Sequence, residues 1–281
     1  MAMKSIFITG AGSGMGREGA KLFHAKGWRV GAIDRNEGLE SLSSELGTDR
    51  IWTRAVDVTD KSALETALAS FCAGNDGGGL DMMWNNAGIG EGGWFEDVPY
   101  EAAMRVVDVN FKAVLTGAYV SLPYLKKSVG SLMFSTSSSS ATYGMPRLAV
   151  YSATKHAVKG LTEALSIEWA RHNVRVADVL PGLIDTAILT NTPDRSDGRV
   201  LTHETRSSGT QEGHVPPDAG VVGGRRGMAG LPASDPTALV CARKHPVDRP
   251  DQGSEPGVDT TADRQGAAPN LRRRLSGRPT L

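Results

Sequence analysis

Short apolar runs alternate with longer amphipathic stretches along the chain as far as residue 180. Six runs are typical of buried strands because they are short and end at Gly, Asp, Asn or Ser; they span 6–8, 29–33, 51–56, 80–84, 132–134 and 174–180. Between them, apolar residues recur at helical spacing over 15–26, 36–46, 60–72, 101–126 and 149–171.

This alternation predicts the fold class. Strands separated by helical segments form βαβ units, and the crossover between two parallel strands is right-handed. Successive right-handed crossovers place helices on both faces of one sheet. We therefore expect an α/β protein with a single doubly wound parallel sheet, of which six strands are readable.

The pattern stops near residue 190. Every aromatic residue lies at or before Trp169, no isoleucine follows Ile188, and ten of the 14 prolines lie after residue 192. A segment so poor in large apolar side chains does not offset the entropy of ordering itself. We therefore expect a folded domain over 1–190 and an irregular, disordered tail over 191–281.

Two origins of this tail remain open. It is either a natural disordered tail or an out-of-frame translation. Twelve arginines and one lysine follow residue 192, with many prolines and glycines, which is the composition expected of a GC-rich gene read in a wrong frame. Sequencing the source locus separates the two.

Charge and cysteine usage narrow the function classes. The 31 basic and 31 acidic residues cancel, so no global field attracts nucleic acid or an anionic membrane. Cys72 and Cys241 are far apart, and neither they nor the six histidines show metal-ligand spacing. The apolar run at 6–8 is too short for a membrane span. We expect a cytoplasmic protein without metal, nucleic acid or membrane partners.

A glycine-rich segment, TGAGSGMG at 9–16, lies between the first strand and the first helix. Its glycines permit a tight turn, and the following helix N-terminus attracts a pyrophosphate. Glycine-rich turns are common, so the prediction of a phosphate-binding loop depends on the position of this segment between a strand and a helix. The candidate phosphate-binding residues are Gly10, Ser13, Gly14, Met15 and Gly16.

Asp34 ends the second strand, 18 residues after Gly16. A carboxylate there accepts hydrogen bonds from an adenosine ribose and repels a 2′-phosphate, although Asp34 could equally cap the next helix. Arg17 and Arg35 favour a 2′-phosphate, whereas position 13 is a serine rather than a basic residue. On balance we expect NAD, with NADP as the less favoured cofactor.

Tyr151 and Lys155 are four residues apart in a predicted helix, so they share one face about 6 Å apart along the axis. The ammonium is expected to lower the pKa of the Tyr151 phenol, which is normally about 10. A phenol so tuned exchanges a proton with an alcohol or carbonyl. The serine run 137–140, at the end of the fifth strand, offers a hydroxyl for the substrate oxygen.

Taken in order, these motifs resemble the short-chain dehydrogenase/reductase family over residues 4 to about 190. The TGxxxGxG spacing of Gly10, Gly14 and Gly16, the NNAG run at 85–88 and the YxxxK at 151–155 carry the resemblance. It implies a Rossmann-like fold and hydride transfer between a nicotinamide cofactor and an alcohol or carbonyl. Relatives continue with further helices and a seventh strand, which this chain does not show after 190.

The resemblance also assigns individual residues. It implies further cofactor contacts from Asp57, Val58, Asn86, Ala87, Gly88, Tyr151, Lys155, Pro181, Gly182, Ile184 and Thr186. Taken alone, Asp57 is equally a helix cap, and the two adjacent Asn residues before Gly88, like the Pro-Gly pair at 181–182, are alternatively plain turns.

For catalysis, the family spacing to Pro146 and Tyr151 selects Ser138 from the serine run, with an uncertainty of one position. The resemblance further implies that Lys155 anchors the nicotinamide ribose and that Asn110 binds a water that links Lys155 to solvent. Taken alone, Asn110 is more often a solvated residue or one that caps a kink.

We therefore expect an oxidoreductase that acts on NAD(H) and a secondary alcohol or ketone. The alternatives are an NADPH-dependent ketoreductase of the 3-oxoacyl type and a silent nucleotide-binding protein, if the unusual tail disrupts the domain. The resemblance implies a homodimer through 101–126 and 149–171, with a tetramer doubtful. An apolar substrate pocket is one interpretation of Trp94, Phe95, Tyr143, Met145, Ile188 and Leu189, and core or rim positions are the equal alternative.

Overall fold

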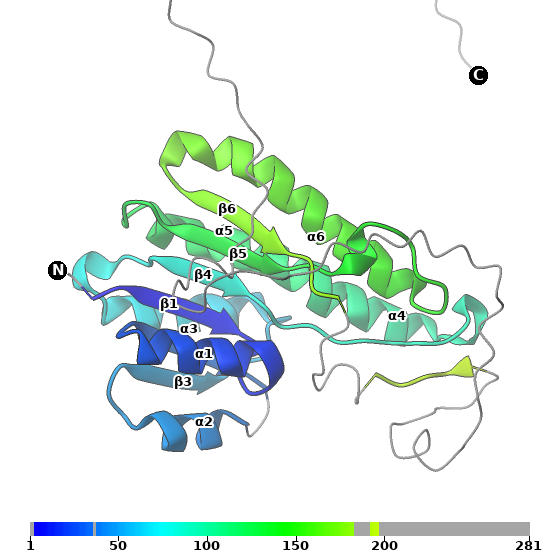
Figure 1. Ribbon diagram of the computed structural model, residues 1–281, viewed down its shortest axis with the longest axis horizontal. Coiled ribbons are helices and arrows are strands. Elements are labelled where there is room, and N and C mark those ends of the chain that lie inside the picture. The colour runs from blue at the N-terminus through cyan, green and yellow to red at the C-terminus, as the bar shows by residue number, and fades with distance from the viewer. Residues whose placement is uncertain (1–2, 36–37, 183–191, 197–281) are drawn as a thin grey trace, which may run out of the picture. The chain divides into compact units, whose positions relative to one another are not determined.

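In this computed structural model, which describes residues 3–35, 38–182 and 192–196, six parallel strands form one sheet in the order β3-β2-β1-β4-β5-β6 (Figure 1). The strands are β1 Ser5–Thr9, β2 Arg29–Asp34, β3 Ile51–Ala55, β4 Met82–Asn85, β5 Leu132–Thr136 and β6 Arg175–Val179. The order reverses between β1 and β4, and ligands of such sheets bind at that switch point. The predicted α/β class and the six predicted strands are confirmed.

Six α-helices connect the strands among the described residues: α1 Gly14–Ala25, α2 Gly38–Leu46, α3 Lys61–Ala73, α4 Tyr100–Val107, α5 Ala113–Leu125 and α6 Ala149–Glu168. Short 3-10 turns occupy Asp76–Gly78, Phe95–Asp97, Ser139–Ala141 and Trp169–His172. No helix in this part of the chain is long and apolar enough to cross a bilayer.

Two apolar clusters cover the two faces of the sheet. One joins α1 and α2 to the sheet and includes Phe23, Leu42 and Phe134. The other joins α3 and α5 to the opposite face and includes Phe71 and Val120. Alternate residues of the strands enter alternate clusters, as the twofold periodicity of a strand requires. The sheet is therefore doubly wound, as predicted.

The helix predicted over 101–126 differs in one respect. Its middle, Asp108–Lys112, is a π-helical turn between α4 and α5. The inserted residue turns Asn110 into the interior, where Ile89 N donates to its Oδ1 at 2.8 Å and its Nδ2 donates to Ile89 O at 2.9 Å. A helical pattern at 3.6 residues per turn does not reveal such an insertion.

Residues 192–196 pack against the segment after β4. Gly92 N donates to Pro193 O, and Arg195 N donates to Gly92 O, each at 2.8 Å. Arg147 pairs with Asp194, and Arg195 pairs with Glu91. The predictions for Ile184, Thr186 and the tail beyond 196 lie outside the described residues, so the division at 190 stays a prediction.

Candidate active site

A cavity of about 350 Å³ opens at the carboxyl ends of the strands, around the switch point between β1 and β4. Its wall contains most of the predicted site residues: Gly10, Ser13, Gly14, Met15, Asp34, Asp57, Val58, Asn86, Ala87, Gly88, Ser138, Tyr151, Lys155, Pro181 and Gly182. Gly16 and Asn110 are buried behind this wall. The topology thus brings together predicted residues that lie between Gly10 and Gly182 in the sequence.

The glycine segment forms one end of the cavity. Gly10 has a φ of +67°, and a Cβ added to Gly16 would overlap the Gly10 carbonyl oxygen. The loop therefore turns directly into α1, whose N-terminal residues line the cavity. The first turn of α1 contains no acidic residue. Because a helix N-terminus carries partial positive charge, this end fits a pyrophosphate.

Asp34 lies beside that loop. Its Oδ2 accepts a hydrogen bond from Gly12 N at 2.9 Å, and its Oδ1 accepts one from Arg35 N at 2.7 Å. Both Asp34 and Arg35 line the cavity. Two backbone N–H groups therefore hold this carboxylate at the edge of the cavity.

Asn86 joins three strands at the switch point. Its Nδ2 donates to Thr9 O at 3.2 Å and to Gly10 O at 3.1 Å, and its Oδ1 accepts from Thr136 Oγ1 at 3.1 Å. Thr9 Oγ1 accepts in turn from the backbone N of Asn86 and of Ala87, each at 3.0 Å. The NNAG run is therefore more than a plain turn, because it fastens the glycine loop to β4 and β5.

Asp57 lies in the wall of the cavity and is not the N-cap of the helix that follows it. It lines the cavity, and it also accepts from Thr59 N at 2.9 Å and from Thr59 Oγ1 at 2.7 Å. These two bonds, the backbone bond first, hold the pKa of Asp57 below its usual value. The N-cap of α3 is a different residue, Asp60, which accepts from Ala63 N at 3.0 Å.

Tyr151 and Lys155 occupy successive turns of α6, and Lys155 Nζ lies 5.6 Å from the centre of the Tyr151 ring. Lys155 is only 3% exposed and donates to Thr136 O at 2.8 Å. Burial lowers the pKa of Lys155 to about 8. The pKa of Lys155 thus lies close to neutral pH, and its Nζ points at the end of β5.

The prediction that Lys155 lowers the pKa of Tyr151 is wrong. Burial raises the pKa of Tyr151, and a hydrogen bond with Ser138 only opposes this rise. The physical reason is that taking the phenolate out of water costs more than these groups return. Lys155 is not among the groups that lower it, and its Nζ is bonded to the Thr136 carbonyl.

The serine run resolves into different roles. Ser137 Oγ donates to the backbone carbonyl of Lys155 at 3.1 Å, which fastens β5 to α6. Ser138 lines the cavity, bonds to Tyr151 and accepts from Ser140 N at 3.1 Å. Of the four serines, Ser138 is therefore the one whose hydroxyl stands next to the phenol.

Asn110 stands behind the cavity at the π turn and is fully buried. A Cβ added to Gly88 would lie 3.4 Å from Asn110 Oδ1 and 3.7 Å from Lys155 Nζ, so both side chains approach this glycine. The side chain of Asn110 holds the Ile89 backbone. It therefore shapes the wall beside Lys155.

Some residues of the wall were not predicted from the sequence: Val56, Ile89, Gly90, Val109, Thr136, Ser137 and Thr192. Thr136 was recognisable, because it ends a buried strand at the same edge as the other polar residues. Thr192 gives no local signal, since it reaches the wall only through the packing of 192–196. Trp94, Phe95 and Tyr143 are all about half exposed or more and do not line the cavity.

Comparison of the chain with known proteins identifies its family. A family model described as short chain dehydrogenase matches residues 4–197. An uncharacterized oxidoreductase of Staphylococcus aureus is 33% identical over 186 residues, which make up 66% of this chain and 80% of that protein.

Solved structures agree. A 3-ketoacyl-(acyl-carrier-protein) reductase from Brucella melitensis, complexed with NADH, is 32% identical, with a TM-score of 0.63 over 67% of this chain and 79% of that one. An alcohol dehydrogenase from the archaeon Thermococcus sibiricus, complexed with 5-hydroxy-NADP, is 26% identical, with a TM-score of 0.62 over 66% and 79%. The chain therefore belongs to the short-chain dehydrogenase family of oxidoreductases.

Proposed function

We propose that this protein interconverts a secondary alcohol and a ketone with NAD(H) as the hydride carrier. One observation supports this above all. Ser138, Tyr151 and Lys155 meet in the wall of a cavity that is bounded on another side by Asp34 and the glycine loop. An anion-binding helix terminus and a titratable phenol in one cavity are what a dinucleotide-dependent proton and hydride transfer requires.

Most of the proposed cofactor residues lie in the cavity wall, whereas Ile184 and Thr186 lie outside the described residues. The pyrophosphate is held by the segment 10–16 at the N-terminus of α1, and the adenosine ribose by Asp34. Lys155 holds the nicotinamide ribose, and the remaining contacts are Asp57, Val58, Asn86, Ala87, Gly88, Pro181, Gly182, Ile184 and Thr186. When bound, the nicotinamide would supply a hydride acceptor for oxidation of the alcohol and a hydride donor for reduction of the ketone.

The protein's own groups handle the proton. Ser138 Oγ and the Tyr151 hydroxyl hold the substrate oxygen between them. In the oxidation direction, Tyr151 takes the hydroxyl proton as the carbon–hydrogen bond breaks, and in the reduction direction it donates that proton to the carbonyl oxygen. Asn110, which lies beside Lys155 next to Gly88, supports the path by which the proton reaches solvent.

Removing the phenol hydroxyl tests this assignment. Tyr151→Phe is expected to lower turnover by several orders of magnitude while the Kd for NADH changes by less than about threefold, because only the proton carrier is lost. Tyr143→Phe is the matched control, since Tyr143 is 55% exposed outside the cavity. Turnover is measured on a panel of secondary alcohols and ketones, and near-normal turnover of Tyr151→Phe would contradict the proposal.

An NADPH-dependent ketoreductase of the 3-oxoacyl type is the second candidate. It is favoured by Arg35, which lines the cavity beside Asp34 and can bind a 2′-phosphate. It is also favoured by the likeness to the ketoacyl reductase from Brucella melitensis. The ratio of kcat/KM for the two cofactors decides between them, and a preference for NADPH would support this second candidate.

A further inference from the structure

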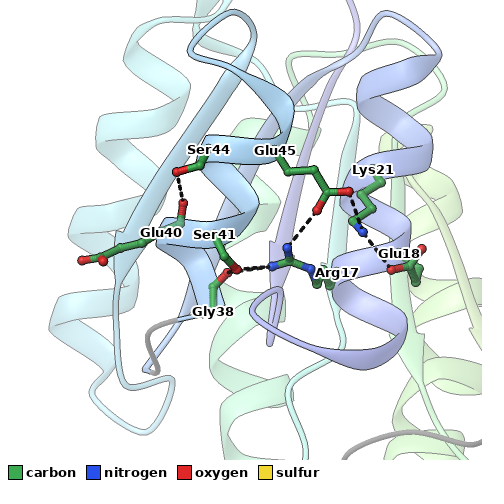
Figure 2. A network of polar contacts seen from close by, with 8 residues as sticks. All are labelled: Arg17, Glu18, Lys21, Gly38, Glu40, Ser41, Ser44 and Glu45. Carbon is green, nitrogen blue, oxygen red and sulfur yellow. Dashed lines mark hydrogen bonds and ion pairs between the residues drawn. The ribbon is translucent and has the colours of Figure 1, made fainter.

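A polar network joins the first helix to the second (Figure 2). Arg17, in the first turn of α1, extends its guanidinium over α2. Nη1 donates to Gly38 O at 2.7 Å and to Ser41 Oγ at 3.0 Å, and Nη2 donates to Glu45 Oε2 at 2.9 Å. The three partners are spaced i, i+3 and i+7, so one guanidinium spans one face of α2 from its first turn to its last.

This contact matters for the position of α2. The helix has nine residues and buries only Leu39 and Leu42. Helices of this length are marginal on their own, so their placement depends on contacts with the rest of the fold. The Arg17 side chain is 19% exposed, and its planar fork is suited to several simultaneous bonds.

Glu45 pairs with two cations of α1, Arg17 and Lys21. Its Oε1 also pairs with Lys21 Nζ at 2.8 Å. The hydrogen bond from Lys21 holds the pKa of Glu45 below its usual value, and Arg17 acts in the same direction. The carboxylate therefore stays ionised at neutral pH and keeps both cations of α1 directed at α2.

The start of α2 rests on the glycine loop. A Cβ added to Gly38 would overlap the Gly12 carbonyl oxygen, so the two backbones are in direct contact. The N–H of the same Gly12 donates to Asp34 Oδ2 at 2.9 Å. Gly12 thus lies between Gly38, which accepts a hydrogen bond from Arg17, and the carboxylate of Asp34.

We propose that Arg17 is a positioning residue for the cofactor site, which acts through Gly38 to keep the glycine loop on Asp34 and does not itself bind a 2′-phosphate. Two observations exclude the phosphate role: Arg17 does not line the cavity, and its guanidinium already donates to three groups of α2. The inference rests on the proposed NAD(H) function and deepens it.

The test compares Arg17→Met with Lys21→Met in the full chain. Lys21 shares Glu45 but makes no bond to Gly38, so it is the matched control. Arg17→Met is expected to raise the Kd for NADH about tenfold, measured by fluorescence titration, and to raise the Kd for NADPH by no larger factor. Hydrogen exchange of the segment 9–16, measured without ligand, becomes faster in Arg17→Met and not in Lys21→Met. Arg17→Lys, which retains a single donor group, lies between wild type and Arg17→Met.

Two results would overturn the inference. If NADPH affinity falls alone, Arg17 is a phosphate ligand. If the melting temperature falls while both Kd values and the exchange of 9–16 stay unchanged, Arg17 serves stability only. A wild-type chain that binds neither dinucleotide would contradict the proposed function instead, whereas the exchange comparison still decides the role of Arg17.

Discussion

Two side chains of opposite charge, Asp34 and Arg35, stand next to each other in the cavity wall. A carboxylate accepts hydrogen bonds from ribose hydroxyls and repels a phosphate, whereas a guanidinium attracts a phosphate. Arg17, the other cation that the glycine segment offered, is directed at α2. We therefore propose that cofactor preference at this end of the cavity depends on the balance between Asp34 and Arg35.

Asp34→Asn tests that balance at the residue scale. The amide keeps an oxygen for Gly12 N but loses the negative charge. We expect the ratio of kcat/KM for NADH over NADPH to fall at least about tenfold, because repulsion of the 2′-phosphate disappears and Arg35 remains. Steady-state kinetics with both cofactors provide the measurement. An unchanged ratio would mean that Asp34 acts only as an acceptor for the glycine loop.

At the scale of elements, a row of polar residues crosses the sheet under the helices. Asn85 on β4, Ser135 on β5 and Asp178 on β6 are register partners and face the same side. Within the described chain, Asn85 Nδ2, Ser135 Oγ and Asp178 Oδ2 are buried without a hydrogen-bond partner. Unpaired buried polar atoms reduce stability, so this row weakens the edge of the sheet.

Asp178 makes this cost depend on pH. Burial raises its pKa from 3.8 to about 6, although Lys159 on α6 opposes the rise, and Glu163 on the same helix adds to it. Because the folded-state pKa lies above the unfolded one, the stability linked to this proton is present below pH 3.8 and is lost as the pH rises through 6.

Asp178→Asn is therefore expected to melt at the wild-type temperature near pH 3.5 and above it at pH 7.5, with the gap opening between pH 4 and 7. Thermal melts across this range measure the gap. Asp76→Asn, at an exposed position, is the control and is expected to show no such trend. A gap that is constant over the whole range would show that Asp178 is not the titrating group.

At the scale of the whole molecule, the helices predicted to form a dimer carry exposed apolar side chains. Tyr119 on α5 is 73% exposed and Ile167 on α6 is 72% exposed. Large apolar side chains gathered on helices are a feature of surfaces that associate. We propose that α4, α5 and α6 pair with their copies in a homodimer.

Light scattering after size exclusion tests the dimer. The wild-type chain is expected at twice the mass of 29.7 kDa, and the double variant Tyr119→Glu and Ile167→Glu at the single mass, because buried unpaired carboxylates disfavour association. Val129→Glu, at a fully exposed position outside these helices, keeps the wild-type mass. A wild-type tetramer, or a double variant that remains dimeric, would contradict this arrangement.

Much of this architecture was predictable because its signals are local. The run 6–8 followed by glycines at 10, 14 and 16 predicts a strand, a turn and a helix, and β1 and α1 follow that order. The spacing of Tyr151 and Lys155 placed both on one face of α6. In each case the pattern lies within a few turns of chain, where backbone geometry leaves few alternatives.

The sequence by itself determined the fold class, the six strands, and most residues of the cavity wall, because strand and helix periodicity and the crossover rule suffice to bring strand ends to one edge. Only the tertiary structure decided the π turn at Asn110, the contact of Thr192, the direction of Arg17 and the raised pKa of Tyr151. These depend on burial and on partners distant in sequence. The environment of each residue sets the free energy of these features, and a local sequence pattern does not reveal that environment.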